Sequence, residues 1–175
     1  IVTATPTPRA TATIAAIRQA ADAGSPEALT IVARSFERGA GVPRDVVKAA
    51  ACYLRAIRVD SPRARELLWG LLQDKRTLAQ IAAAAKQGNA EAEFAWAGLS
   101  ALGFDPQLAQ AQVYVTGDQA FRLLTQSADH GYLPALVETG LCFYAGRWVP
   151  QSTERALQAW SDAATRGSKD AHVRI

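Results

Sequence analysis

The side chains best suited to chemistry are few in this sequence and lie far apart along it. Its only histidines are His130 and His172, and its only cysteines are Cys52 and Cys142. The sequence contains no Cys-x-x-Cys pair, no His-Glu-x-x-His motif and no Gly-x4-Gly-Lys phosphate loop. The segment GLSAL at 98–102 lacks the final glycine of a nucleophile elbow. These residues therefore predict no enzyme, no metal site and no cofactor.

Binding is the other chemistry to consider, and Trp148 beside Arg147 is its clearest signal. Tryptophan and arginine are among the residues most enriched at binding hot spots. Two interpretations of Trp148 stay open. Its ring contacts a partner, or it folds back over the seam between two helices and covers Tyr144 or Val149.

Five points along the chain define a repeat in which a glycine is followed four residues later by an alanine. They are 28 to 43 residues apart, and they stand at Gly24, Asp60 (in place of glycine), Gly88, Gly131 and Gly167. A period of this length indicates stacked supersecondary units.

Two of these units align without a gap, residues 24–56 with residues 131–163. The alignment places Trp148 at the position of Gly41, in the turn between two expected helices. Each unit therefore follows one structural plan, and a tryptophan replaces a turn glycine in the second of them.

The sequence of each unit predicts two helices. Ser25-Pro26 and Ser61-Pro62 are expected helix starts, because serine is a good N-cap and proline suits the first helical position. Asp45 is placed to cap a second helix after the glycine-containing turn.

The first full unit almost fully follows the motif Gly-x3-Ala-x3-Leu-Gly-x2-Tyr-x2-Gly-x-Gly-Val-x2-Asp-x2-Lys-Ala. This is the pattern of Sel1-like repeats, relatives of the tetratricopeptide repeat, and the unit resembles them. The positions that follow it there are Ala28, Val32, Ala33, Phe36, Gly39, Gly41, Val42, Asp45, Lys48 and Ala49. The fourth unit keeps Ala135, Gly140, Phe143, Gly146, Val149 and Ala156. This resemblance implies an all-α fold, a right-handed α-solenoid of antiparallel helix pairs.

Some Sel1-like proteins carry a disulfide between the two helices of one unit, but Cys52 and Cys142 lie in different units. A solenoid would hold them beyond disulfide reach. We therefore expect both to be buried small hydrophobic residues. His130 is expected at a helix C-terminus, where a cationic side chain interacts favourably with the helix dipole.

We expect an extended linker rich in Thr, Pro and Ala at 1–12 and a repeat domain at 13–175. Its units are predicted at 13–24 (partial), 25–60, 61–88, 89–131, 132–167 and 168–175 (partial). The incomplete end units predict a longer protein, or a degenerate cap at the C-terminus.

Two of the units depart from the common length. The short second unit should join helices near 62–73 and 76–86 by a tight connection. The third unit carries an insertion within 104–117, for which a tolerated surface loop and a functional one both stay open.

In the family the first helix of each pair lines the concave face, and the resemblance implies a partner-binding surface there. By register this surface should be charged in its N-terminal half and apolar in its C-terminal half. The predicted contact residues are Arg34, Glu66, Phe94, Leu102, Val137, Leu141, Tyr144 and, from the turn, Arg147 and Trp148. A register error of one residue would instead put Phe94 or Leu141 into the core between the helices.

Composition narrows the remaining classes. With 49% hydrophobic and 20% charged residues, the chain is expected to fold beyond its N-terminal segment. The net charge of +3 is scattered and lacks interleaved aromatic residues, which predicts no nucleic-acid partner. The densest basic patch is expected to be a solvated face; it comprises Arg55, Arg58, Arg63 and Arg65. No apolar run approaches a membrane span, so we expect no membrane insertion of this segment.

The resemblance implies a non-enzymatic protein–protein interaction module, a scaffold or adaptor within a larger, bacterial-type protein. Its partner would be a peptide or protein bound on the concave face, and its location periplasmic or otherwise exported, with the cytoplasm left open. Two alternatives also stay open. An immunity or inhibitor protein that masks a secreted effector would form a tight one-to-one complex, and a peptidoglycan-binding domain would bind glycan fragments weakly and saturably.

Overall fold

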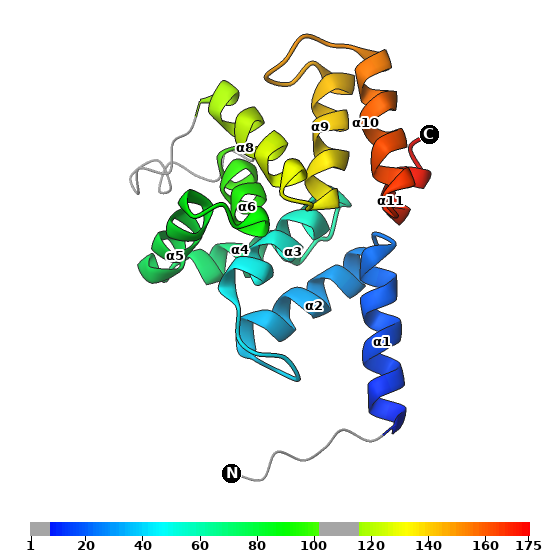
Figure 1. The fold of residues 1–175 in the computed structure, drawn as a ribbon. Coiled ribbons are helices and arrows are strands. Elements are labelled where there is room, and N and C mark those ends of the chain that lie inside the picture. Colours follow the sequence, from blue (N-terminus) through cyan, green and yellow to red (C-terminus); the bar gives the residue numbers. More distant parts are fainter. Residues whose placement is uncertain (1–7, 102–115) are drawn as a thin grey trace.

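The computed structural model describes residues 8–101 and 116–175, and every regular element in these ranges is an α-helix. The helices are α1 (Pro8–Asp22), α2 (Pro26–Arg38), α3 (Val46–Arg58), α4 (Ala64–Leu72), α5 (Lys75–Lys86), α6 (Ala90–Ala101), α8 (Gly117–Asp129), α9 (Leu133–Ala145), α10 (Thr153–Thr165) and α11 (Lys169–His172). Neighbouring helices pack in pairs, and the pairs stack along the chain (Figure 1). The expected fold class, a right-handed α-solenoid, is confirmed.

Side-chain caps start most of these helices where the sequence predicts them. The Ser25 hydroxyl accepts a hydrogen bond from the Ala28 N–H at 3.3 Å, and the Asp45 carboxylate caps α3 in the same way. The expected start at Ser61 is wrong. Helix α4 begins at Ala64 without a side-chain cap, and the Ser61 hydroxyl instead lies 3.0 Å from that of Thr30.

Left-handed backbone residues form the turns inside the helix pairs. Gly39 and Gly146 end α2 and α9 with φ of +71° and +67°. Two residues further on, Gly41 has φ of +74°, and Trp148 has φ of +63°. The alignment of the two units is thus confirmed at the level of the backbone, and Trp148 adopts a conformation that normally favours glycine.

Three helix pairs pack most extensively, namely α2 with α3, α6 with α8, and α9 with α10. Helices α9 and α10 approach each other closely at Gly140. A Cβ atom there would lie 2.3 Å from Nε1 of the buried Trp160. Leu102 and most of the predicted insertion, up to residue 115, lie outside the described residues. Helix α8 begins directly after them with a capping box between Thr116 and Gln119.

The second unit departs from the pair geometry. Helices α4 and α5 lie near their expected positions and are joined by only two residues, yet they contact each other far less than the other pairs do. Helix α4 is short, and α3 packs directly against α6 across this unit.

At the N-terminus, α1 begins at Pro8, so residues 8–12 are helical and not extended as expected. Proline tolerates this position because its fixed φ suits the first helical turn. Helix α1 then packs against α2, as the second helix of a preceding unit would.

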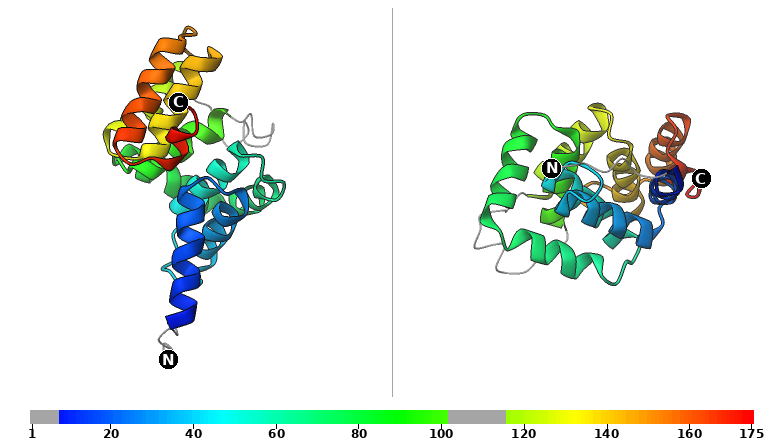
Figure 2. Two further views of the ribbon diagram at one scale, coloured as in Figure 1. Left: turned by 90° about the vertical axis from the view of Figure 1, so that its right-hand side faces the viewer. Right: turned by 90° about the horizontal axis from the view of Figure 1, so that it is seen from below.

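The solenoid curls so strongly that its last helix returns to its first turn. Figures 1 and 2 show α11 beside the turn between α1 and α2. At this point an Asp170 carboxylate oxygen lies 3.9 Å from where a Cβ atom would stand on Gly24. Residues separated by most of the chain therefore face one another.

Candidate binding groove

An open groove lies between the N-terminal and C-terminal helix pairs, and we call it the central groove. Side chains from α2, α3, α6, α8, α9, the α9–α10 turn and the segment around α11 line it. Its empty volume is about 710 Å³, the part open to solvent included.

Five of the predicted contact residues come together in this groove: Phe94, Val137, Leu141, Arg147 and Trp148. Phe94 and Val137 form part of its apolar floor and are 6% and 3% exposed. Phe94 also packs edge-on against Tyr132, with ring centroids 5.2 Å apart. Leu141, Arg147 and Trp148 are half-buried along its wall.

The other predicted contact residues lie elsewhere. Arg34 and Glu66 do not line the central groove. Tyr144 is 54% exposed and packs beside Trp160, with ring centroids 5.9 Å apart. Leu102 is outside the described residues. The expected division into a charged and an apolar half of the first-helix surface stays a prediction, and the central groove itself mixes both kinds of side chain.

Sequence reasoning missed five charged residues of the groove: Arg55, Arg58, Glu138, Asp170 and Arg174. Arg55 and Arg58 were expected on a solvated face, yet both are half-buried and line the groove from the last turn of α3. Their spacing of three residues, which puts them on one helix face, was the available signal. It could not show that α9 and α11 would face them.

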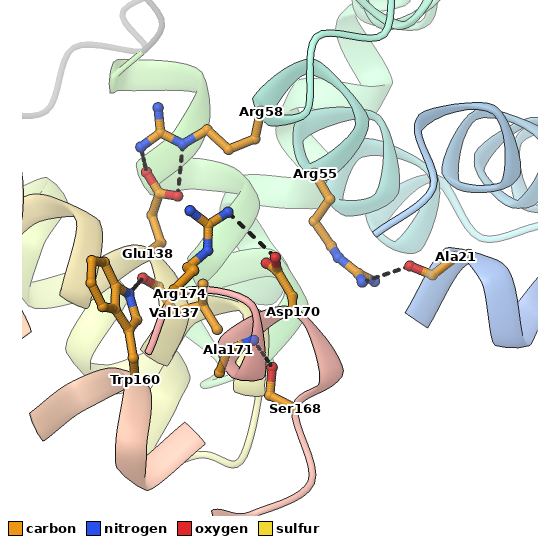
Figure 3. Close-up of polar contacts among 10 residues, drawn as sticks. All are labelled: Ala21, Arg55, Arg58, Val137, Glu138, Trp160, Ser168, Asp170, Ala171 and Arg174. Atoms are coloured by element: carbon orange, nitrogen blue, oxygen red, sulfur yellow. Dashed lines mark hydrogen bonds and ion pairs between the residues drawn. The ribbon is translucent and has the colours of Figure 1, made fainter. Parts of the chain in front are cut away.

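An ion pair joins opposite walls of the groove. The Nε of Arg58 donates to a Glu138 carboxylate oxygen at 2.9 Å, and its Nη2 donates to the other oxygen (Figure 3). Arg147 approaches the same carboxylate, with Nη1 at 3.9 Å. Such a two-pronged guanidinium–carboxylate contact fixes geometry as well as charge. It ties α3 to α9 across 80 residues of sequence.

Trp148 supports one end of the groove. Its ring lies against Gly117 at the start of α8, where a Cβ atom would come within 2.4 Å of Cδ1. The Arg147 guanidinium lies 5.6 Å from the Trp148 ring centroid, within cation–π range. The ring thus covers the start of α8, the second helix of the neighbouring pair.

The residues first considered for catalysis occupy structural positions. Cys52 and Cys142 are both buried and free, as expected. Burial raises the pKa of the Cys52 thiol to about 11 and that of Cys142 to about 12, because it disfavours the thiolate. His130 ends α8 and its Nδ1 lies 2.8 Å from the buried Glu93 carboxylate. This pair fastens α8 to α6.

Two further searches of the described residues bear on the class of protein. Within 8–101 and 116–175, no group of three or more His, Cys, Asp or Glu residues is arranged to hold a metal ion. In the same ranges no helix combines the length and apolar character that crossing a membrane requires.

Stacked helix pairs curled around a mixed polar and apolar groove define a solenoid repeat protein of the tetratricopeptide-like class. The family model for the Sel1 repeat matches residues 26–61, 117–132 and 133–168, which together make up half of the chain. The chain belongs to the Sel1 repeat family. Repeats of this family are generally protein–protein interaction modules, and their fold is typically a non-catalytic scaffold.

Solved structures that are similar to the chain include the following two. A Sel1 repeat protein from Oxalobacter formigenes shares 22% identity with a TM-score of 0.49; the match covers 96% of this chain and 64% of that one. A protective antigen of uropathogenic Escherichia coli with an SLR fold shares 18% identity with a TM-score of 0.32, over 88% of this chain and 33% of that one. No curated protein sequence matches the chain.

Proposed function

We propose that this chain is a non-enzymatic interaction module, a scaffold or adaptor within a larger protein, and that it receives a segment of a partner protein in the central groove. The observation that carries the proposal is the convergence of five predicted contact residues in one groove. An apolar floor under a half-buried tryptophan and arginine has the composition of a binding hot spot.

The proposal differs in one respect from the sequence-based hypothesis. The expected surface used first helices and the turn at Arg147 and Trp148, whereas the central groove also takes side chains from the second helices α3 and α8. A partner segment would therefore contact both helices of a pair and would lie inside the curl of the solenoid. It would touch the N-terminal and C-terminal repeats together.

A matched pair of leucine variants tests this proposal. Leu141→Glu puts a carboxylate into the groove wall, and Leu157→Glu makes the same change on α10 at a side chain that is already 42% exposed. Wild type and both variants are used as bait in lysate of the source organism, after circular dichroism has shown that all three are folded. Retained proteins are identified by mass spectrometry, then purified and titrated by calorimetry.

We expect a protein that wild type and Leu157→Glu retain and that Leu141→Glu loses, with a matching loss of affinity for the purified protein. Equal retention by all three baits would refute the groove as the binding site. Retention of nothing by the wild type would refute the adaptor function.

The remaining sequence-based hypotheses stay predictions. An exported or periplasmic location is checked by fractionating cells that express the tagged protein. The immunity and peptidoglycan alternatives are checked by titrating the purified protein with the captured partner and with muropeptides.

A further inference from the structure

The central groove carries an excess of positive charge on its walls. Four arginines line it: Arg55 and Arg58 from α3, Arg147 from the α9–α10 turn, and Arg174 beyond α11. Two carboxylates, Glu138 and Asp170, oppose them. The lining residues that the structure describes therefore have a net charge of +2. Figure 3 shows five of these six charged side chains around one space between α3, α9 and α11.

The carboxylate of Glu138 is fully engaged by the groove itself. It accepts both guanidinium bonds of Arg58 and lies near Arg147, so two positive charges share one negative charge. Glu138 is also largely shielded from solvent, with 15% of its side chain exposed. The Glu138 carboxylate is therefore held in place by Arg58 and Arg147, and its negative charge does not offset the charge of the other groove arginines.

The charge of Arg55 is not matched within the groove. Its Nη2 donates to the Ala21 carbonyl oxygen at 3.2 Å, and its side chain also lines a neighbouring pocket together with Asp22, Glu91 and Tyr132. Arg55 forms no ion pair with any carboxylate of residues 8–101 or 116–175. A guanidinium has five N–H donors, so these contacts leave donors for a ligand.

Arg174 adds a second incompletely satisfied guanidinium. Its Nη2 pairs with Asp170 at 3.3 Å, while its buried Nε has no hydrogen-bond partner. A buried N–H without an acceptor is costly, so this end of the groove is not fully satisfied by its own contacts. Arg55 is thus the guanidinium whose donors a ligand in the groove would take.

Apolar side chains lie directly beside these arginines. Leu54, Phe94 and Leu124 are buried in the floor, and the half-buried Leu141 and Trp148 leave apolar surface on the wall. A bulky apolar side chain of a ligand would complete this surface and remove it from water. The groove therefore combines one apolar contact area with an unneutralised positive charge.

We propose that the occupant of the central groove is a segment of a partner protein in which an Asp or Glu stands next to a bulky apolar residue. The apolar side chain packs on Leu141 and Trp148, and the carboxylate takes the donors of Arg55. This inference rests on the proposed function and specifies its ligand. A basic segment would meet like charge and be rejected. The small, apolar-floored space suits a few side chains and not a phosphate backbone.

Selection from phage-displayed random dodecapeptides tests the inference. The library is panned on the wild type, on Arg55→Gln/Arg147→Gln, which removes the net charge of the groove, and on Arg76→Gln as control. Arg76 is exposed near the start of α5 and does not line the groove, so its loss changes the total charge alone. Circular dichroism verifies the fold of each variant, and sequencing gives the composition of the bound peptides.

We expect wild type and Arg76→Gln to enrich peptides with Asp or Glu adjacent to Phe, Leu, Ile or Trp. The double variant should keep the apolar preference and lose the acidic one. Enrichment of basic or uncharged peptides, or no enrichment, would overturn the inference. So would an acidic preference that survives in the double variant.

A second measurement needs no variant of the protein. The most enriched peptide is synthesised with its acidic residue intact and with the corresponding amide, and both are titrated into the wild type by calorimetry. We expect the amide to bind about ten-fold more weakly, the effect of losing one charged hydrogen-bonded contact. The difference should shrink as ionic strength rises. Equal affinities would overturn the inference.

The two proposals fail separately. If Leu141→Glu abolishes capture of a partner but acidic and amide peptides bind equally, the groove is a binding site and its charge preference is wrong. If acidic peptides bind through the groove and no partner protein is captured, the ligand chemistry holds and the adaptor function fails.

Discussion

Replacement of Gly140 by alanine should destabilise the protein, although alanine normally favours a helix. Gly140 lies inside α9, where its missing side chain lets Trp160 of α10 approach. A Cβ atom there would lie 2.3 Å from Nε1 and 2.5 Å from Cδ1 of the indole. Because Trp160 is buried and its Nε1 donates to the Val137 carbonyl oxygen at 3.1 Å, the ring can move only by breaking that bond and repacking.

The magnitude follows from three opposing terms. Forcing an extra methyl group into a packed core costs about 1–3 kcal/mol. Loss of the indole hydrogen bond costs about 1 kcal/mol. Better helix propensity returns about 1 kcal/mol. The expected net loss is about 2 kcal/mol of unfolding free energy, which lowers the melting temperature of a chain of this length by about 4–8 °C.

Two other helical glycines provide matched controls. A Cβ atom on Gly70 in α4 would meet nothing within 4 Å, so Gly70→Ala should stabilise by about 1 kcal/mol. On Gly98 in α6 it would lie 3.0 Å from Cδ1 of Leu54, whose flexible end can yield, so the gain and the cost should nearly cancel. The expected order of stability is therefore Gly70→Ala above Gly98→Ala above Gly140→Ala.

Thermal and urea unfolding followed by far-UV circular dichroism measure this order. Because solenoid repeats can unfold in steps, midpoints of the curves are compared in place of extrapolated free energies. A Gly140→Ala variant as stable as Gly70→Ala would refute the close contact between α9 and α10.

Three further results are expected. The folded protein should react slowly with a thiol reagent at pH 8, and two thiols should become reactive in urea, because burial raises the pKa of Cys52 and Cys142. The thiols of the unfolded chain ionise at lower pH, so the free energy of unfolding should fall as pH rises above about 9. Fast reaction of the folded protein would contradict the burial. His130→Ala should lower the free energy of unfolding, measured by denaturant titration, by about 1 kcal/mol. The change removes the hydrogen-bond partner of the Glu93 carboxylate, whose side chain is only 4% exposed. An unchanged unfolding midpoint would show that water replaces His130 fully. The Trp148→Gly variant should be about 1 kcal/mol more stable than Trp148→Ala, and so should have the higher melting temperature. Both variants lose the same ring, but glycine alone tolerates the left-handed backbone at φ of +63° without strain. The reverse order of melting temperatures would argue against that conformation.

Local signals account for the parts of the fold that were predicted correctly. The N-caps Ser25 and Asp45 start helices where the sequence predicts them, and Gly39 ends α2 in a left-handed conformation. Each of these signals acts within about four residues, so a single sequence is enough to recognise it. The predicted helix start at Ser61 was wrong because such a signal is local. The Ser61 hydroxyl instead bonds to Thr30 of another helix pair, which the neighbouring sequence does not show.

Five of the nine predicted contact residues line the central groove, and most of the residues that line it were not predicted. Repeat register singled out Leu141 and Trp148, which lie at repeated positions of a unit and line the central groove. It could not place Arg58 and Glu138 opposite each other in one groove. The contact of Arg58 with Glu138 spans 80 residues and depends on how several helix pairs are rotated relative to one another.

The sequence by itself determined the helices, their turns and their assembly into Sel1-type repeats, because these depend on short-range capping, backbone conformation and hydrophobic periodicity. The tertiary structure alone decided the curl that brings α11 back to the first turn, and with it the central groove. The angle between successive pairs is set by contacts such as those of α3 with α6 and of α8 with α9. Small rotations of this kind add up along a solenoid, so the mixture of charge and apolar surface inside the groove emerges only when all pairs are in place.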